Sequence, residues 1–125
     1  MIKILLVDDK LEVIRGWRMR LGLEDDMRIV GEAQNGETAL HLAQETQPDI
    51  ILLDLNLAGR DGIKLIPRFH DLVPKGKVII VTIYDNRPQR VRAEAAGAIE
   101  FIAKQESPER LLTAIREAIH LPAKM

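Results

Sequence analysis

The stretch DIILLDLNLAGRDG (residues 49–62) passes through four apolar residues directly into an aspartate, Asp54. The start of the chain repeats this pattern, because IKILLVDD (residues 2–9) passes through an apolar run into Asp8 and Asp9. A carboxylate beside an apolar core is strongly destabilising unless a cation or hydrogen bonds compensate it. Two such endings in one small chain therefore indicate a functional site.

Short apolar runs alternate with longer amphipathic segments, which is typical of βα units around a parallel sheet. The expected strands are residues 2–7, 28–33, 50–53, 78–81 and 99–102. Several are apolar at successive positions, as strands covered by helices on both faces are. The sequence therefore predicts an α/β fold with a doubly wound, five-stranded parallel sheet. The strand at 28–33 is less apolar, and we expect it at an edge.

The expected helices are residues 11–23, a segment beginning after Asn35, residues 62–72, residues 87–96 and a segment beginning after Ser107. Asn35 and Ser107 are the expected N-caps of their helices. Pro67 predicts a kink or a late start in the third helix, because proline removes a backbone hydrogen bond. The fourth helix has Val91 as its only large apolar residue, so we expect it to be the least firmly docked. The last helix is expected to bury Leu111, Leu112, Ile115, Ala118 and Ile119.

Length and composition place the chain among ordinary globular proteins. Its 125 residues fit a single domain, residues 1–125, and 46% of them are apolar and 30% charged. A net charge of −1 provides no general attraction to nucleic acid or membrane. The absence of cysteine excludes disulfides, thiolate metal sites and cysteine nucleophiles. Neither a signal peptide nor a membrane span is recognisable, so we expect a cytoplasmic protein that binds no membrane and no nucleic acid directly.

Five polar residues are expected at one edge of the predicted sheet, because ligands of such folds bind beyond the carboxyl ends of the strands. They are Asp8, Asp9, Asp54, Thr82 and Lys104. Carboxylates about 5 Å apart repel by about 3 kcal/mol per pair at an effective dielectric near 20, so they require a cation. Oxygen ligands suit Mg²⁺ or Mn²⁺. An aspartate beside a metal and a lysine can attack a phosphoryl group and form an aspartyl phosphate.

Each of these residues also has a purely structural interpretation. Asp8 or Asp9 alone can cap the first helix, and Asp54 alone can occupy a turn. Thr82 alone is an ordinary strand end, and Lys104 alone is an ordinary solvated side chain. Their common location at the ends of strands favours a site over these separate explanations.

Six stretches together resemble a known family over essentially the whole chain. They are ILLVDD (4–9), VGEAQNGETAL (30–40), PDIILLDLNLAGRDG (48–62), VIIVTIYDN (78–86), AGAIEFIAK (96–104) and SPERLLTAI (107–115). In this order and spacing the chain resembles the receiver domain of two-component response regulators. Residues 30–40 and the TIYD segment look most like receivers attached to LuxR-type helix-turn-helix DNA-binding domains. The resemblance implies a flavodoxin-like (βα)5 fold with strand order 2-1-3-4-5.

The resemblance also assigns roles to the residues at the predicted sheet edge. It implies that Asp54 is the phosphoacceptor and that Lys104 pairs with the phosphoryl group. It implies that Asp9, Asp54 and the backbone carbonyl of Asn56 ligate Mg²⁺ or Mn²⁺, with Asp8 assisting through water.

A conformational switch is the function implied by the resemblance. Thr82 is expected to turn toward the phosphoryl group, and Phe101 occupies the position of the aromatic switch residue. The expected partners are a histidine kinase as phosphodonor, a second copy of the chain in a homodimer, and a C-terminal DNA-binding output domain outside this chain. The chain is expected to be a signalling switch that catalyses only its own phosphorylation and dephosphorylation, and otherwise no enzyme.

Four positions depart from the family pattern. Ala58 stands where proline is common, Ile83 where a small residue is usual, and Phe101 where tyrosine is frequent. Gln105 replaces a proline that often follows a cis peptide bond, so the geometry of this peptide stays open. These departures leave room for an alternative, a phosphorylation-independent binding or dimerisation module with the same fold.

Two further alternatives are disfavoured by single features of the sequence. A haloacid-dehalogenase-like phosphatase would carry a second aspartate two residues after the nucleophile, where this chain has Asn56. A flavin carrier would have a phosphate-binding loop rich in Gly, Ser and Thr after the first strand, where this chain continues with Asp8 and Asp9.

Overall fold

A five-stranded parallel sheet forms the centre of the computed structural model, which describes residues 1–121. Its strands are β1 (Ile2–Val7), β2 (Met27–Ala33), β3 (Ile50–Leu53), β6 (Lys77–Thr82) and β7 (Glu100–Ala103). They lie in the order β2-β1-β3-β6-β7, with β2 at one edge. This confirms the doubly wound α/β fold and the predicted order 2-1-3-4-5 of the five sheet strands. The predicted domain boundary of 1–125 includes residues 122–125, which lie outside the described part of the chain.

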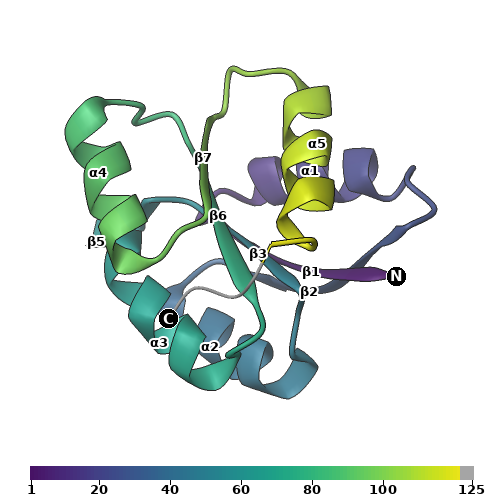
Figure 1. Cartoon of the computed structure of the whole chain (residues 1–125), viewed down its shortest axis with the longest axis horizontal. Coiled ribbons are helices and arrows are strands. Elements are labelled where there is room, and N and C mark those ends of the chain that lie inside the picture. Colours follow the sequence, from purple (N-terminus) through teal and green to yellow (C-terminus); the bar gives the residue numbers. More distant parts are fainter. Residues whose placement is uncertain (122–125) are drawn as a thin grey trace.

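Five helices cover the two faces of the sheet: α1 (Leu11–Leu21), α2 (Gly36–Thr46), α3 (Ile66–Leu72), α4 (Arg87–Ala96) and α5 (Pro108–Ala118). Figure 1 shows α1 and α5 together on one side of the sheet, with α3 and α4 on the other. Within residues 1–121, no helix combines the length and apolar character required to span a bilayer.

Alternation along the strands divides the interior into two cores. Ile4 and Leu6 of β1 belong to a core with residues of α1 and α5, whereas Leu5 and Val7 belong to a second core with residues of α2, α3 and α4. Successive side chains of a strand point to opposite faces, so a strand between two helical layers must be apolar at every position. The uninterrupted apolar runs of the sequence follow from this arrangement.

Helix boundaries follow the predicted signals with two corrections. Asn35 caps α2, since its side chain accepts a hydrogen bond from the Thr38 N–H at 2.9 Å. A 3-10 turn, η1 (Gly62–Leu65), precedes α3, so Pro67 lies in the first turn of a helix that starts late. Ser107 occupies the N-cap position of α5 but makes no side-chain capping hydrogen bond. Ile119, expected to be buried by α5, is 37% exposed because it lies just beyond the end of the helix.

The fourth helix makes only a small apolar contact with the rest of the fold. Val91, its only large apolar residue, is 55% exposed, and Ala93 is the residue that α4 buries. Charged contacts supplement this small apolar contact: Arg90 pairs with Asp85 at 2.6 Å, and Arg92 pairs with Asp61. Two arginines of α4, Arg90 and Arg92, therefore form ion pairs within the chain.

An acidic loop, residues 24–26, follows α1 and forms ion pairs with α5. Arg116 of α5 donates hydrogen bonds to Glu24 at 2.6 Å and to Asp26 at 2.9 Å. These hydrogen bonds lower the pKa of both carboxyl groups. The loop therefore joins the two helices that cover the same face of the sheet.

Candidate functional site

The carboxyl ends of four strands bring together side chains from distant parts of the sequence. Asp8 follows β1, Asp54 follows β3, Thr82 ends β6 and Lys104 follows β7. The Lys104 Nζ atom lies 2.8 Å from Asp8 Oδ2 and 3.2 Å from Asp54 Oδ2. Asp8 is 0% exposed and Asp54 is 3% exposed. The predicted convergence of these residues is therefore present, with one ammonium group between two buried carboxylates.

One oxygen of this cluster has no hydrogen-bond donor. Within residues 1–121, Asp54 Oδ1 is the buried side-chain atom without a hydrogen-bond partner. Asp8, Asp9 and Asp54 each offer a carboxylate oxygen within 4.8 Å of the others. An unpartnered buried oxygen is costly unless an additional ligand satisfies it. The carboxylate oxygens of Asp8, Asp9 and Asp54 together therefore suit a hard divalent cation, which prefers oxygen ligands.

Asp8 is held by the protein on both of its oxygens. Oδ1 accepts a hydrogen bond from the Lys10 N–H at 2.9 Å, and Oδ2 accepts one from Lys104. Burial raises the pKa of Asp8, although the hydrogen bonds from Lys104 and Lys10 act in the opposite direction. Burial opposes the charge of Lys104 as well, but its hydrogen bond to Asp8 and the charges of both carboxylates raise its pKa. The N-cap position of α1 is Lys10, which has no side-chain cap, so neither Asp8 nor Asp9 caps this helix.

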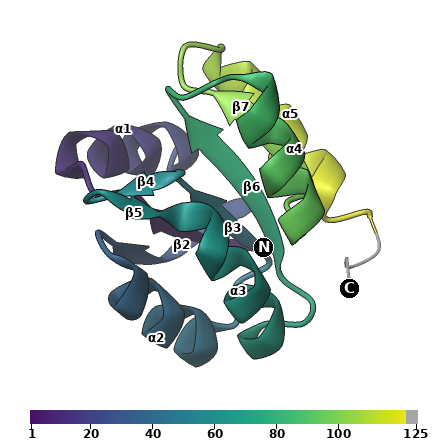
Figure 2. The same ribbon diagram turned by 90° about the vertical axis from the view of Figure 1, so that its left-hand side faces the viewer.

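A short hairpin without a clear signal in the sequence lies beside the acids. It consists of β4 (Asn56–Leu57) and β5 (Arg60–Asp61), follows β3 and leads into α3 (Figure 2). The two residues between the strands, Ala58 and Gly59, have φ of 52° and 82°. Positive φ at both positions is the requirement of a type I′ turn, which is normally recognised by Asn-Gly or Asp-Gly. This turn has Ala-Gly at these positions, so the sequence does not predict it.

The turn also positions a predicted metal ligand. The Ala58 N–H donates a hydrogen bond to Asp9 Oδ2 at 3.1 Å. Proline has no N–H and cannot adopt this φ, so the departure from the family pattern at Ala58 provides a contact that proline would remove. Asn56 is half-buried at the start of the hairpin, and its side chain accepts a hydrogen bond from the Gly59 N–H. The role of the Asn56 backbone carbonyl stays a prediction.

Gly62 lies directly behind the site, and no pattern in the sequence indicates its importance there. Its N–H donates to the Leu55 carbonyl oxygen at 2.5 Å. A Cβ at this position would lie far inside contact distance of the Asp54 carbonyl oxygen, and 3.0 Å from that of Leu55. Backbone atoms cannot move aside as flexible side chains can. A residue without a side chain is therefore required where the hairpin returns to the end of β3.

We expect Gly62→Ala to lower the free energy of unfolding by about 1–3 kcal/mol, because the methyl group must displace the backbone at Asp54. Urea denaturation measures this change. Gly16→Ala is the matched control: Gly16 lies inside α1, no atom is within 4 Å of its virtual Cβ, and alanine there should stabilise the chain by about 0.5–1 kcal/mol. Equal stability of the Gly62→Ala variant and the wild type would contradict the close approach of position 62 to the backbone of Asp54.

The loop after β6 closes another side of the site. Thr82 is 0% exposed, and its Oγ1 accepts a hydrogen bond from the Tyr84 N–H at 3.1 Å. Ile83 is 50% exposed and Tyr84 is 45% exposed. The Tyr84 hydroxyl lies 3.5 Å from Asn56 Nδ2, so this loop approaches the hairpin. Tyr84 belongs to the TIYD segment, and no pattern in the sequence predicts its contact with the hairpin.

Phe101, the predicted switch residue, points toward the core that includes α3 and α4. It is 7% exposed, and the guanidinium carbon of Arg90 lies 4.7 Å from its ring centroid. The open question about Gln105 is answered by the backbone, since residues 1–121 contain no cis peptide bond.

Comparison with known proteins identifies the family of the chain. The model of the response regulator receiver domain matches residues 4–116. The nitrate/nitrite response regulator protein NarL of Escherichia coli (strain K12) is 33% identical over 115 residues, which are 92% of this chain and 53% of that protein. The chain therefore spans about half the length of the curated relatives it matches.

Solved structures agree with this assignment. A two-component response regulator of the LuxR family from Aurantimonas sp. SI85-9A1 is 29% identical, with a TM-score of 0.90 over 98% of this chain and 88% of that one. A response regulator protein from Burkholderia pseudomallei, solved with a phosphorylated aspartic acid, calcium ion and citrate, is 29% identical, with a TM-score of 0.79 over 94% of this chain and 70% of that one. The chain belongs to the receiver domain family of two-component response regulators, and its relatives include regulators of the NarL and LuxR type.

Proposed function

We propose that this receiver is controlled by phosphorylation and accepts a phosphoryl group on Asp54 from a histidine kinase, with Mg²⁺ or Mn²⁺ as cofactor. The observation that supports this most strongly is Asp54 Oδ1, a buried carboxylate oxygen without a protein donor, in a side chain whose other oxygen pairs with Lys104. A purely structural aspartate would have both oxygens satisfied.

The residues around Asp54 suit the chemistry of phosphoryl transfer. An oxygen of Asp54 attacks phosphorus, the bond from phosphorus to the donor's imidazole nitrogen breaks, and the Asp54 side chain becomes an acyl phosphate. Lys104 provides a fixed positive charge beside the reacting carboxylate, and Thr82 provides a hydroxyl for a phosphoryl oxygen. A divalent ion held by Asp8, Asp9 and Asp54, with the Asn56 carbonyl, would supply further positive charge to the transferring group.

The relative from Burkholderia pseudomallei supports this proposal, because its structure holds a phosphorylated aspartic acid together with a calcium ion. We infer the same modification for Asp54 of this chain. Calcium is also a hard cation that takes oxygen ligands, as Mg²⁺ and Mn²⁺ do.

Phosphorylation is proposed to change a surface used by partners. The added charge would draw Thr82 toward the phosphoryl group and shift α4, which buries only Ala93. The affected face would then bind a second copy of the chain or a C-terminal DNA-binding output domain. We propose a cytoplasmic signalling switch that catalyses only its own phosphorylation and dephosphorylation. The alternative is a binding or dimerisation module with the same fold that does not depend on phosphorylation.

Incubation with acetyl phosphate tests the proposal. The wild-type chain is expected to gain the mass of one phosphoryl group when Mg²⁺ or Mn²⁺ is present, and none when EDTA removes the metal. Intact-mass spectrometry measures the adduct. No adduct with acetyl phosphate or with a panel of histidine kinases would favour the phosphorylation-independent module.

Asp9→Asn tests the metal site while the phosphoacceptor Asp54 stays unchanged, in the same acetyl phosphate experiment. Asparagine offers one neutral oxygen in place of a carboxylate, so the variant should require a higher Mg²⁺ concentration for the same adduct yield. Millimolar Mg²⁺ should also raise the melting temperature of the wild type more than that of this variant, because a ligand that binds only the folded state stabilises it. An identical response to Mg²⁺ in both proteins would contradict the role of Asp9.

A further inference from the structure

We propose that a groove between the β4–β5 hairpin, α2 and α3 is a docking site for an acidic segment of a partner protein. Three exposed cations, Arg60, Lys64 and Arg68, line this groove, which we call the basic groove. None of the residues proposed to hold the metal or the phosphoryl group lines it, so docking there does not require phosphorylation.

The basic groove has a volume of about 900 Å³ and is built from consecutive elements that follow β3. Figure 2 shows the β4–β5 hairpin above α2, with α3 beside α2. The hairpin contributes Arg60, η1 contributes Lys64 and α3 contributes Arg68. The first turn of α2 contributes Glu37. The cations therefore follow one another along one side of the groove.

Apolar side chains underlie the charged ones. Leu57 is 3% exposed and Leu65 is half-buried, and both line the basic groove. Gly36 of α2 lies against Leu65, since a Cβ at position 36 would be 3.1 Å from Leu65 Cδ2. Close packing between α2 and η1 therefore closes the base of the groove. A concave surface with an apolar base and a few convergent polar groups is typical of ligand sites.

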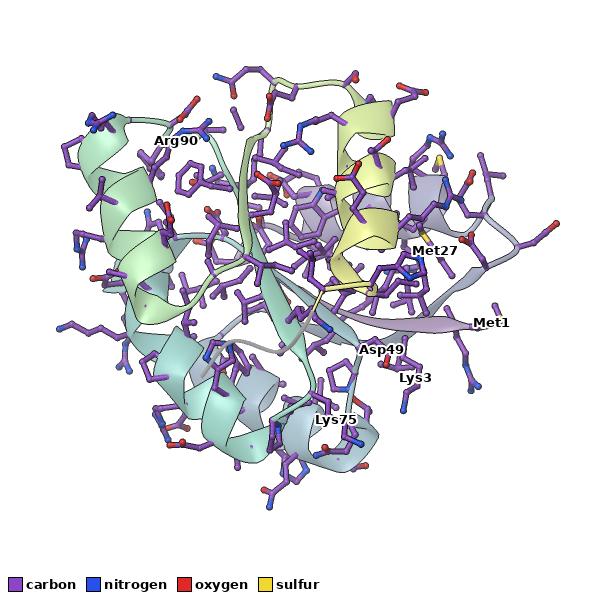
Figure 3. The ribbon with its side chains drawn as sticks, viewed as in Figure 1. Met1, Lys3, Met27, Asp49, Lys75 and Arg90 are labelled. Carbon is purple, nitrogen blue, oxygen red and sulfur yellow. The ribbon has the colours of Figure 1, made fainter. Side chains whose placement is uncertain are left out.

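The three cations of the basic groove form no ion pair within residues 1–121. Elsewhere, arginines commonly pair with carboxylates of this chain. Arg90, which Figure 3 shows at the start of α4, pairs with Asp85, and Arg116 pairs with Glu24. Unpaired charges of one sign that share a concave surface attract ligands of the opposite sign. The positive charge of the groove is therefore available to an anionic ligand.

The acids beside the cations do not cancel this charge. Asp61 pairs with Arg92 of α4, and it accepts a hydrogen bond from the Ile63 N–H at 3.1 Å, so its charge is already compensated. Glu37 is exposed and is the remaining acid among the lining residues. One such acid against three cations leaves a positive groove on a chain whose net charge is −1. The attraction to anions is therefore local to this groove.

An acidic polypeptide segment fits the spacing of the cations. Lys64 and Arg68 are four residues apart in consecutive turns of η1 and α3, which places their Cβ atoms about 5–6 Å apart. Carboxylates on alternate residues of an extended chain are about 7 Å apart. The long side chains of lysine and arginine can bridge this small difference. One extended segment can therefore place a carboxylate beside each cation.

Two other occupants fit the basic groove less well. A single-stranded nucleic acid normally stacks its bases on aromatic side chains, and no Phe, Tyr or Trp lines the groove. A second copy of the chain would have to offer an acidic segment, but Glu24 and Asp26 of its acidic loop pair with Arg116. The charge pattern therefore favours an acidic segment of a different protein.

A fluorescein-labelled peptide of alternating glutamate and glycine, about six residues and thus about 20 Å long when extended, is the probe. Fluorescence anisotropy at low ionic strength should show binding to wild type, and added salt should weaken it. Lys64→Gln and Arg68→Gln should each weaken binding about two- to fivefold, as loss of an exposed ion pair does. The double variant Lys64→Glu/Arg68→Glu also repels the peptide and should weaken binding about tenfold or more.

Backbone amide resonances locate the bound peptide without any substitution. Gly36, Gly59 and Gly62 line the basic groove, whereas Gly16 of α1 and Gly97 after α4 do not. In ¹H–¹⁵N spectra of wild type, the peptide should shift the first three resonances and leave the other two in place. Shifts that spare the three groove glycines overturn the inference.

Lys75→Gln is the matched control, because Lys75 is exposed in the loop between α3 and β6 and does not line the groove (Figure 3). This variant should bind the acidic peptide as wild type does. A loss equal to that of Lys64→Gln would indicate a general effect of charge and overturn the inference. So would the absence of binding to wild type, or equal binding of a peptide with glutamine in place of glutamate.

The other occupants give distinct results. Tighter binding of an oligothymidylate than of the acidic peptide would assign the basic groove to nucleic acid and overturn the inference. Self-association of wild type that Lys64→Glu/Arg68→Glu abolishes would identify a second copy as the occupant, with the same consequence. All of these measurements use the unphosphorylated chain without acetyl phosphate. Failure of Asp54 to accept a phosphoryl group would therefore refute the proposed function and leave the test of the groove unaffected.

Discussion

Asp54→Asn is expected to abolish phosphorylation of this chain. The amide that replaces the carboxylate is a poor nucleophile and cannot form an acyl phosphate, and one negative charge is removed from the predicted metal site. After incubation with acetyl phosphate and Mg²⁺, the variant should show only its unmodified intact mass, whereas wild type should show the adduct. The expected loss is complete within detection, which makes this the largest effect predicted for the chain.

Two controls make the result specific. Asp25→Asn removes the same charge from an exposed position and should leave the adduct yield unchanged. Asp54→Asn should also remain folded, since asparagine has nearly the same shape as aspartate, and circular dichroism can verify this. An adduct of undiminished yield on the Asp54→Asn variant would place the phosphoacceptor elsewhere and contradict the proposed function.

The second large effect is expected from Lys104→Met, which retains an unbranched side chain, one atom shorter, and removes its charge. Removal of one fixed charge beside a reacting group typically slows transfer by about 10²–10³-fold, so phosphorylation should be slowed by a factor of this order. The ammonium group is also the cation that pairs with the buried carboxylates of Asp8 and Asp54. Without metal, its loss should lower the free energy of unfolding by about 3 kcal/mol near neutral pH.

The stability loss of Lys104→Met should be larger at neutral than at acidic pH. Burial raises the pKa of Asp8 above its usual range, and removal of Lys104 takes away a hydrogen bond that opposes this shift. A carboxyl group whose pKa is raised in the folded state makes folding less favourable as pH rises through that pKa. Lys104→Met should therefore be closer to wild type in stability at about pH 4–5 than at about pH 7, as urea denaturation at each pH can measure.

Addition of Mg²⁺ and substitution of a distant lysine serve as controls for Lys104→Met. Millimolar Mg²⁺ should restore part of the lost stability, because a bound cation replaces some of the missing positive charge. Lys75→Met changes an exposed lysine and should affect neither stability nor phosphorylation. Stability losses of Lys104→Met that are identical at both pH values would indicate that Asp8 and Lys104 do not interact as described.

Much of the fold and most of the acidic site were predictable because both depend on short-range patterns. The apolar runs at 2–7 and 50–53 are strands with those bounds, and the helix at 87–96 also has its predicted bounds. Parallel strands present their carboxyl ends at one edge, so the residues that follow them must be neighbours. This rule alone predicts that Asp8, Asp54 and Lys104 lie together.

Other parts of the site carried no recognisable local signal. The hairpin at 56–61 turns through Ala58 and Gly59, a pair that only weakly indicates a type I′ turn. The need for glycine at position 62 arises from the backbone at Asp54 and Leu55, which the chain approaches only after it has folded back. No local pattern shows that Val91, the only large apolar residue of α4, faces solvent while Ala93 is buried.

By itself, the sequence determined the α/β class, the parallel sheet and the acids at its edge, because hydrophobic periodicity and strand polarity are properties of contiguous residues. Only the tertiary structure decided which oxygen of Asp54 lacks a donor, which backbone N–H holds Asp9, and which group covers the ring of Phe101. Each of these depends on atoms that are far apart in the chain and within a few ångströms in space. Such contacts are set by packing and register, for which a single sequence contains no local pattern.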